Sequence, residues 1–255
     1  YDPSGTDVAV GDVVRLTGTV DEYYGNTQIK TVTNLEVCST GATLPSAAAL
    51  ALPLTATDDL EDVEGMLVTF AETLYVTETY NLGRYGEVHL SGTAVLDNPT
   101  NVAEPGPASD AIDAANDLNR VLLDDASGVQ NPPVVEHLRT TNDTLRLGDT
   151  TTGLTGTIYY AYDYYRIQPV GDVVFSPDAG RSEGAPDVGG TLKVASFNVL
   201  NYFTTFGSRG ADDQTELDRE RDKIINASIL LDAGVIGIME IENKGYGNSG
   251  IKKRG

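Results

Sequence analysis

The 255-residue chain has one cysteine, two histidines, and only 17 Lys and Arg against 38 Asp and Glu. Its single cysteine, Cys38, excludes an intrachain disulfide, so cysteine pairing does not reveal the compartment. No apolar run approaches the length of a membrane span, and the start at Tyr1 does not resemble a signal peptide. The net charge of −21 argues against nonspecific nucleic-acid binding through the bulk surface, because phosphate contacts need basic side chains.

An internal repeat is the first pattern that the sequence contains. Residues 11–20 recur as residues 148–158, with Gly-Asp at the start and Thr-Gly-Thr near the end of each copy. The second copy has one extra residue, which indicates a bulge. Both copies continue into tyrosines and then a segment of alternating polarity that contains glutamine. Each copy therefore predicts a β-hairpin of a small antiparallel module.

The region between the copies is also predicted to be mainly β. Alternating segments occur at residues 65–70, 73–77, 86–91 and 120–125, with a helix expected at 109–119. From these patterns we expect the following organisation: the C-terminal part of a first β module at 1–45, a second β module at 59–177, a Pro/Gly/Asp-rich linker at 178–191, and a different domain at 192–255. The first module lacks the upstream strands of its twin, so we expect it to take contacts from the second.

The segment after the linker consists of two apolar strands, residues 192–200 and 235–241, joined by a stretch with helical spacing. Such a unit is a right-handed crossover between parallel strands. It brings the strand-end residues Asn198 and Glu240 to one edge of a sheet, where open α/β folds place their chemistry. For Asn198 the alternative is a side chain satisfied by the next loop. A carboxylate inside the apolar run around Glu240 must be paired, metal-bound or neutralised.

These two strands resemble the opening of the endonuclease/exonuclease/phosphatase superfamily. The segments 202–206 and 209–212 are similar to large secreted bacterial nucleases, in which OB-like β modules precede the nuclease domain. The resemblance implies a mainly β fold, with OB-like antiparallel β modules followed by the opening βαβ unit of an α/β sandwich nuclease domain. It also implies that Glu240 is a Mg²⁺ ligand, with Mn²⁺ or Ca²⁺ as alternatives, and that Asn198 contacts the metal-bound phosphate region. Nucleic acid is the implied substrate of the full-length protein.

Other features of the chain depart from that family. Its general-base histidine and final strands are expected further downstream, whereas the only histidines here, His89 and His137, precede the linker. We therefore expect a truncated, inactive catalytic domain whose incomplete sheet edges favour self-association. The Ser/Thr/Gly/Asp-rich, Lys-poor composition favours an extracellular protein. The alternative function is a non-catalytic OB-like binding or spacer module. The residues do not decide between DNA and RNA.

Further substrate-binding candidates carry basic or aromatic side chains. Arg209 follows the first apolar strand of the last domain, and Tyr160, Tyr164 and Arg166 belong to a tyrosine-rich hairpin. OB-like folds stack bases on such tyrosines, and Arg166 could contact a phosphate. The alternative, cross-strand packing of tyrosines in an exposed hairpin, is the one that the residues favour.

Overall fold

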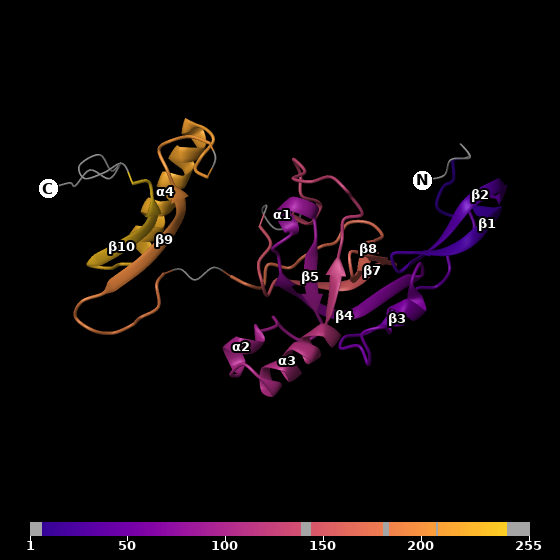
Figure 1. The fold of residues 1–255 in the computed structure, drawn as a ribbon, viewed down its shortest axis with the longest axis horizontal. Coiled ribbons are helices and arrows are strands. Elements are labelled where there is room, and N and C mark those ends of the chain that lie inside the picture. The colour runs from indigo at the N-terminus through magenta and orange to yellow at the C-terminus, as the bar shows by residue number, and fades with distance from the viewer. Residues whose placement is uncertain (1–6, 139–143, 181–183, 208, 244–255) are drawn as a thin grey trace. The chain divides into compact units, whose positions relative to one another are not determined.

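The computed structural model describes residues 7–138, 144–180, 184–207 and 209–243. The chain divides into two compact units, residues 1–180 and 181–255. Figure 1 colours the first from indigo to orange and the second from orange to yellow. In the described part of the chain, no helix is long and apolar enough to cross a membrane.

The first unit is built around a five-stranded barrel, which confirms the mainly β, largely antiparallel prediction. Its strands are β4 (Leu67–Glu78), β5 (Val88–Ser91), β6 (Arg120–Leu123), β7 (Thr150–Ala161) and β8 (Tyr164–Pro169). The sheet order is β4-β5-β6-β8-β7, and a β4–β7 pairing closes it. Only the β6–β8 pairing within this ring is parallel. A short strand, β3 (Ala48–Leu50), adds to β4 in parallel.

Strand β4 shows how alternation builds the barrel core. Val68, Phe70, Leu74 and Val76 are all fully buried. These buried positions keep one alternating phase along the strand, although a bulge shifts its pairing register with β7 between Phe70 and Thr73. Such a bulge keeps apolar side chains on the inner face on both sides of the irregularity. The two strands expected at 65–70 and 73–77 are therefore one continuous strand.

Short helices lie outside the barrel strands. The expected helix at 109–119 is confirmed as α3 (Pro107–Leu118), which begins with proline at its first turn. It follows α2 (Pro99–Val102), and Figure 1 shows both helices together at one end of the barrel. The remaining short helices are α1 (Leu82–Tyr85) and two 3₁₀ turns, η1 (Glu61–Val63) and η2 (Glu136–Leu138).

Both repeat copies form antiparallel hairpins, as predicted. The first is β1 (Val13–Tyr23) with β2 (Asn26–Ser39), and the second is β7 with β8. The copies also share backbone detail: Gly11 has a φ of 92° and Gly148 a φ of 93°.

The aspartates that follow these glycines make equivalent hydrogen bonds. Asp12 Oδ2 accepts from Ala9 N at 2.9 Å, and Asp149 Oδ2 accepts from Arg146 N at 2.8 Å. In both hairpins the two central turn residues have positive φ, which matches the right-handed twist of the paired strands. The two copies therefore share backbone geometry as well as sequence.

The β1–β2 hairpin takes contacts from the barrel at its tip. Asn26 Nδ2 donates to Glu64 Oε1 at 2.9 Å, and Thr27 N donates to Glu64 Oε2 at 3.1 Å. Gly25 lies directly against the Tyr160 ring, since a Cβ at Gly25 would meet Tyr160 Cε1 at 2.6 Å. These contacts agree with the expectation that the N-terminal module packs against the second module.

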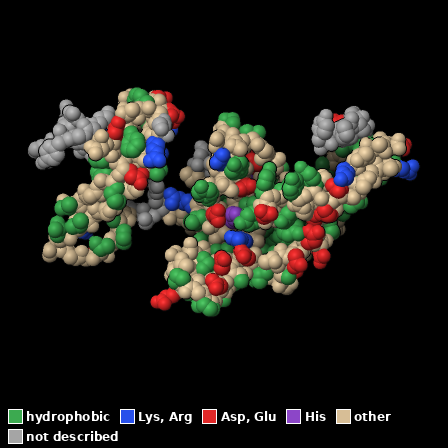
Figure 2. Space-filling model, in the orientation of Figure 1, with side chains coloured by type: hydrophobic (Ala, Val, Ile, Leu, Met, Phe, Trp, Pro, Cys, Tyr) green, Lys and Arg blue, Asp and Glu red, His purple; other side chains and the backbone are tan. Residues whose placement is uncertain are grey.

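The second unit is a strand–helix–strand element: β9 (Val194–Tyr202), α4 (Gln214–Leu230) and β10 (Val235–Ile241). The two strands pair in parallel. Asp213 caps α4 by accepting from Glu216 N at 2.9 Å. Within the described residues of this unit, Ala211 and Leu217 are the buried hydrophobic side chains. Figure 2 shows hydrophobic side chains on its surface.

Candidate functional site

Strands β9 and β10 bring Asn198 and Glu240 together where their regular pairing ends; Asn198 lies in the middle of β9, which continues beyond the expected strand to Tyr202. Asn198 is paired in register with Met239, the residue before Glu240. Asn198 Nδ2 donates to Glu240 Oε1 at 2.7 Å, and Asn198 Oδ1 accepts from Leu200 N at 2.9 Å. The juxtaposition predicted from the crossover is thus present in the structure.

Glu240 is not buried, although the sequence predicts that it is. Both Glu240 and Asn198 are exposed. The two-stranded sheet leaves side chains of both strands open, and the pairing register jumps between Met239 and Ile241. Glu240 is therefore not forced into an apolar interior, and the argument from buried charge was wrong for this residue.

Local backbone strain accompanies this register jump. Leu200, Asn201 and Glu240 have φ values of 53°, 59° and 61°, in the left-handed region that non-glycine residues rarely adopt. Each such residue costs on the order of 1–3 kcal/mol, and strain of this kind gathers at functional sites. The Asn198 side chain, bonded to Leu200 N on one side and to Glu240 on the other, links the irregular parts of both strands.

Glu242, two residues further along, has a different environment. Its Oε2 accepts from Thr204 N at 2.8 Å, Thr204 Oγ1 at 2.7 Å and Thr205 N at 3.2 Å, and its Oε1 accepts from Thr205 Oγ1. These bonds tether the loop after β9 to the end of β10. We therefore assign Glu242 to positioning this loop.

The chemistry of the pair suits a weakly held hard cation. In the described residues no three His, Cys, Asp or Glu side chains gather closely enough to hold a metal ion. Mg²⁺ does not require such a cage, because it keeps several waters and is bound through one or two carboxylates plus substrate phosphates. Glu240 would supply the carboxylate, held by the Asn198 amide. The donor set fits the ion in this limited sense.

The other candidate residues are not among the hydrogen-bond partners of the Asn198–Glu240 pair. Arg209 is exposed on the loop between β9 and α4. Tyr160, Tyr164 and Arg166 belong to the barrel of the first unit. The structure therefore unites Asn198 with Glu240 but assigns the three barrel residues to a separate set of contacts.

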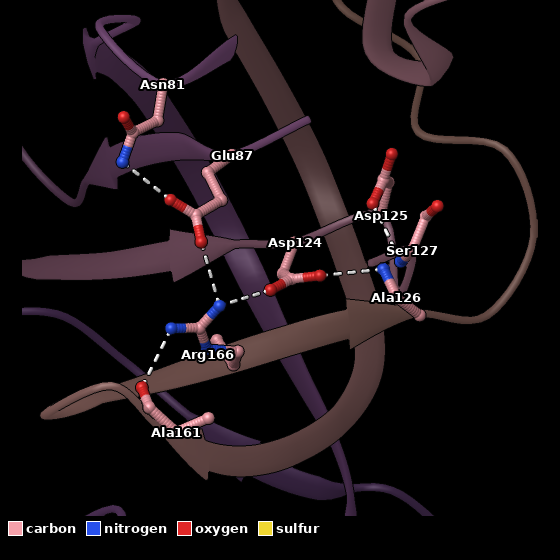
Figure 3. A network of polar contacts seen from close by, with 8 residues as sticks. All are labelled: Asn81, Glu87, Asp124, Asp125, Ala126, Ser127, Ala161 and Arg166. Atoms are coloured by element: carbon pink, nitrogen blue, oxygen red, sulfur yellow. Dashed lines mark hydrogen bonds and ion pairs between the residues drawn. The ribbon is translucent and has the colours of Figure 1, made fainter. Parts of the chain in front are cut away.

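Arg166 is the centre of a buried ion-pair network (Figure 3). The residue is 4% exposed, and its Nη1 contacts Glu87 Oε1 at 2.9 Å and Asp124 Oδ2. Its Nη2 donates to Ala161 O at 2.8 Å. Two carboxylates thus balance the guanidinium charge, and the network joins β8 to the ends of β6 and β7 and to the segment before β5. Arg166 is placed to hold the barrel together.

Further hydrogen bonds hold both carboxylates of this network. Asn81 Nδ2 donates to Glu87 Oε2 at 2.7 Å, and Ala126 N donates to Asp124 Oδ1 at 2.7 Å. Sequence reasoning missed Glu87 and Asp124 as partners of Arg166. The one available signal was the Asp124–Asp125 pair at the end of an apolar strand, where a buried charge needs a counter-charge.

Three titratable groups near this network are perturbed by burial. Desolvation lowers the pKa of His89 and of His137, while burial raises the pKa of Asp125. His137 is 2% exposed, and its Nε2 has no hydrogen-bond partner among the described residues. Both histidines therefore favour the neutral form.

The tyrosines form aromatic contacts on two parts of the barrel. Tyr164 lies edge-to-face on His89, with ring centroids 5.7 Å apart, and Arg120 lies 5.9 Å from its ring. Tyr160 packs against Tyr165 at 4.7 Å. The Tyr160–Tyr165 pair, which β7 and β8 place opposite each other, is an example of the cross-strand tyrosine packing that the sequence favours.

Comparison with known families identifies the barrel region. A family model described as Domain of unknown function (DUF8508) matches residues 41–178. The chain belongs to this family. The DUF8508 match runs from before β3 to beyond β8, so it contains the whole barrel, while the β1–β2 hairpin and the second unit lie outside it. Comparison with curated proteins and with solved structures yields no match.

Proposed function

We propose that the second unit is the metal-binding edge of a Mg²⁺-dependent phosphodiesterase that hydrolyses nucleic acid. The observation that carries this proposal is the Asn198–Glu240 contact of 2.7 Å at the point where the regular pairing of two parallel strands ends. The resemblance of both strands to the endonuclease/exonuclease/phosphatase superfamily supports the same function. Mn²⁺ and Ca²⁺ are alternative ions for the site.

Each residue of the pair has its own role in this proposal. Glu240 binds the cation through its carboxylate. Asn198 is a positioning residue, because its amide donates to Glu240 Oε1 and fixes the direction of the carboxylate. When bound, the metal ion would activate a water molecule and stabilise charge on phosphorus. It would also offset locally the repulsion between phosphate and a chain of net charge −21.

We propose that the barrel is an OB-like accessory module. Five strands closed into a largely antiparallel barrel are compatible with that fold, whose strand faces and loops bind oligonucleotides. Tyr164, which is 45% exposed, is the tyrosine that we propose for base stacking, with Arg120 near its ring. A phosphate contact through Arg166 is disfavoured, since its charge is buried and balanced. This binding role without catalysis is the second candidate function, and the composition supports an extracellular setting for either.

The test is whether the chain binds a short, fluorescently labelled single-stranded DNA in a metal-dependent way. Binding is measured by fluorescence anisotropy in Mg²⁺ and in chelator. We expect binding in Mg²⁺, loss of at least about tenfold in affinity in Glu240→Gln, and no change in Glu220→Gln, a control on α4. We expect no DNA cleavage by this chain, because no histidine follows Asn198. Equal binding by Glu240→Gln and the control would contradict the proposal and favour the barrel as the binding site.

A further inference from the structure

A hollow of about 500 Å³ lies where the tip of the β1–β2 hairpin meets the barrel. Three parts of the first unit form it: the hairpin tip, the segment around η1, and the β7–β8 hairpin. The side chains on which the argument depends are Glu22, Asp58, Glu61, Tyr160, Asp163 and Tyr165. Neither the proposed phosphodiesterase edge nor the Arg166 network includes this hollow.

Two tyrosine rings form its aromatic wall. Tyr160 and Tyr165 lie 4.7 Å apart with an interplanar angle of 57°. Gly25 backs onto Tyr160, because a Cβ at that position would meet the ring at 2.6 Å. The Tyr165 hydroxyl donates to Glu61 Oε2. Both rings are thus held by neighbours and present a preformed surface.

The same contacts determine the protonation state of the Tyr165 hydroxyl. Burial raises the pKa of Tyr165, and the hydrogen bond to Glu61 adds to the effect. The ring therefore remains a neutral phenol at ordinary pH. A neutral phenol has an electron-rich face that attracts cations.

Charge is the second distinguishing property of the hollow. Four carboxylates line it, and no Lys or Arg is among the lining residues. Figure 2 shows that acidic side chains are spread over the visible face of the first unit, with few basic ones among them. Phosphate and other anions are therefore repelled, whereas a cation gains from both the carboxylates and the rings.

We propose that this hollow binds a small organic cation with primary ammonium groups on a short alkyl chain, the chemical class of the polyamines. Ammonium groups pair with the carboxylates, and the methylene chain packs on Tyr160 and Tyr165. A bare metal ion uses less of this surface, because it has no methylene chain to pack on the two rings. The proposal does not depend on the phosphodiesterase activity of the second unit.

The experiment is a titration of the ¹⁵N-labelled chain with 1,4-diaminobutane at 150 mM NaCl, followed by amide chemical shifts. We expect saturable shifts confined to residues 22–27, 57–61 and 160–165. The double variant Asp58→Asn/Asp163→Asn should bind about three- to tenfold more weakly, as expected for the loss of two exposed ion pairs. Asparagine tolerates the positive φ of Asp163, so folding is preserved.

Two controls make the titration decisive. Asp97→Asn/Asp113→Asn changes the net charge equally at exposed residues outside the hollow and should bind like the unaltered chain. Tyr160→Leu, which keeps the charge, should weaken binding by a similar factor. The proposal is overturned by shifts that spread over the surface without saturating, by equal binding of the two double variants, or by CaCl₂ saturating the same amides at lower concentration than the diamine.

Discussion

The barrel and the β9–α4–β10 unit place polar groups in opposite environments. In the barrel, Arg166 and Asp124 are paired in the interior, at 4% and 7% exposure, above a core with many fully buried side chains. In the second unit, Asn198 and Glu240 meet on an exposed edge, and apolar side chains such as Val194 and Leu200 are 68% and 78% exposed.

This difference separates a buried structural charge network from the exposed pair that we propose as a cation site. The barrel closes its sheet on itself, so its buried charges have to be balanced within the fold. The second unit leaves a carboxylate and an amide facing solvent, where an ion or a phosphate can reach them. Each prediction below sharpens or breaks this contrast.

The largest expected difference is in amide hydrogen exchange. Barrel amides at Val68 and Phe70 should exchange at least about a hundredfold more slowly than those at Phe197 and Ile238, because open sheets with few buried contacts unfold locally. The measurement is exchange followed by NMR on a sample shown to be monomeric by sedimentation. Equal protection in a monomer would mean that the second unit is as stable as the barrel. Protection that rises with concentration would support the self-association through sheet edges that the sequence predicts.

The second-largest expected effect is the loss of stability when the buried positive charge of Arg166 is removed. Arg166→Met should destabilise the barrel by about 3–5 kcal/mol, because Glu87 and Asp124 are left uncompensated. Urea unfolding followed by circular dichroism measures this cost. The matched control, Lys193→Met, breaks the exposed Lys193–Asp232 pair of the second unit and should leave the midpoint unchanged. Similar effects in both variants would remove the distinction between the regions.

The smallest effect concerns pH. Burial lowers the folded-state pKa of His137 and His89, so below about pH 6.5 the unfolded chain binds protons that the folded barrel does not. The free energy of unfolding should therefore fall between pH 7.5 and 5, with the opposite shift of Asp125 acting at lower pH. His137→Gln should flatten this dependence in urea titrations. A flat profile for the unaltered chain would show that His137 protonates equally in both states.

Local patterns in the sequence were sufficient for much of the fold. The repeat at Gly11 and Gly148, the helix α3 and the parallel pairing of β9 with β10 all follow from residue periodicity and turn chemistry. The Asn198–Glu240 contact was predictable because a crossover helix makes the two strands parallel neighbours, which sets Asn198 beside Met239 and so close to Glu240.

Contacts between residues far apart in the sequence could not be predicted from local patterns. Arg166 contacts residues 42 and 79 positions away, and nothing near it in sequence marks Asp124 or Glu87 as its partners. Barrel closure by β4 and β7 is equally nonlocal. The exposure of Glu240 was predicted wrongly because an apolar run looks the same whether or not a second layer covers it.

The central claim, a cation site at Glu240, is tested most directly by paramagnetic broadening with Mn²⁺. Substoichiometric Mn²⁺ added to the ¹⁵N-labelled chain should broaden the Asn198 side-chain amide and the amides of residues 198–201 and 239–241 first. The same signals should stay sharp in Glu240→Gln and broaden normally in Glu220→Gln. Broadening that begins in the acidic surface of the barrel, or that is unchanged by Glu240→Gln, would contradict the account.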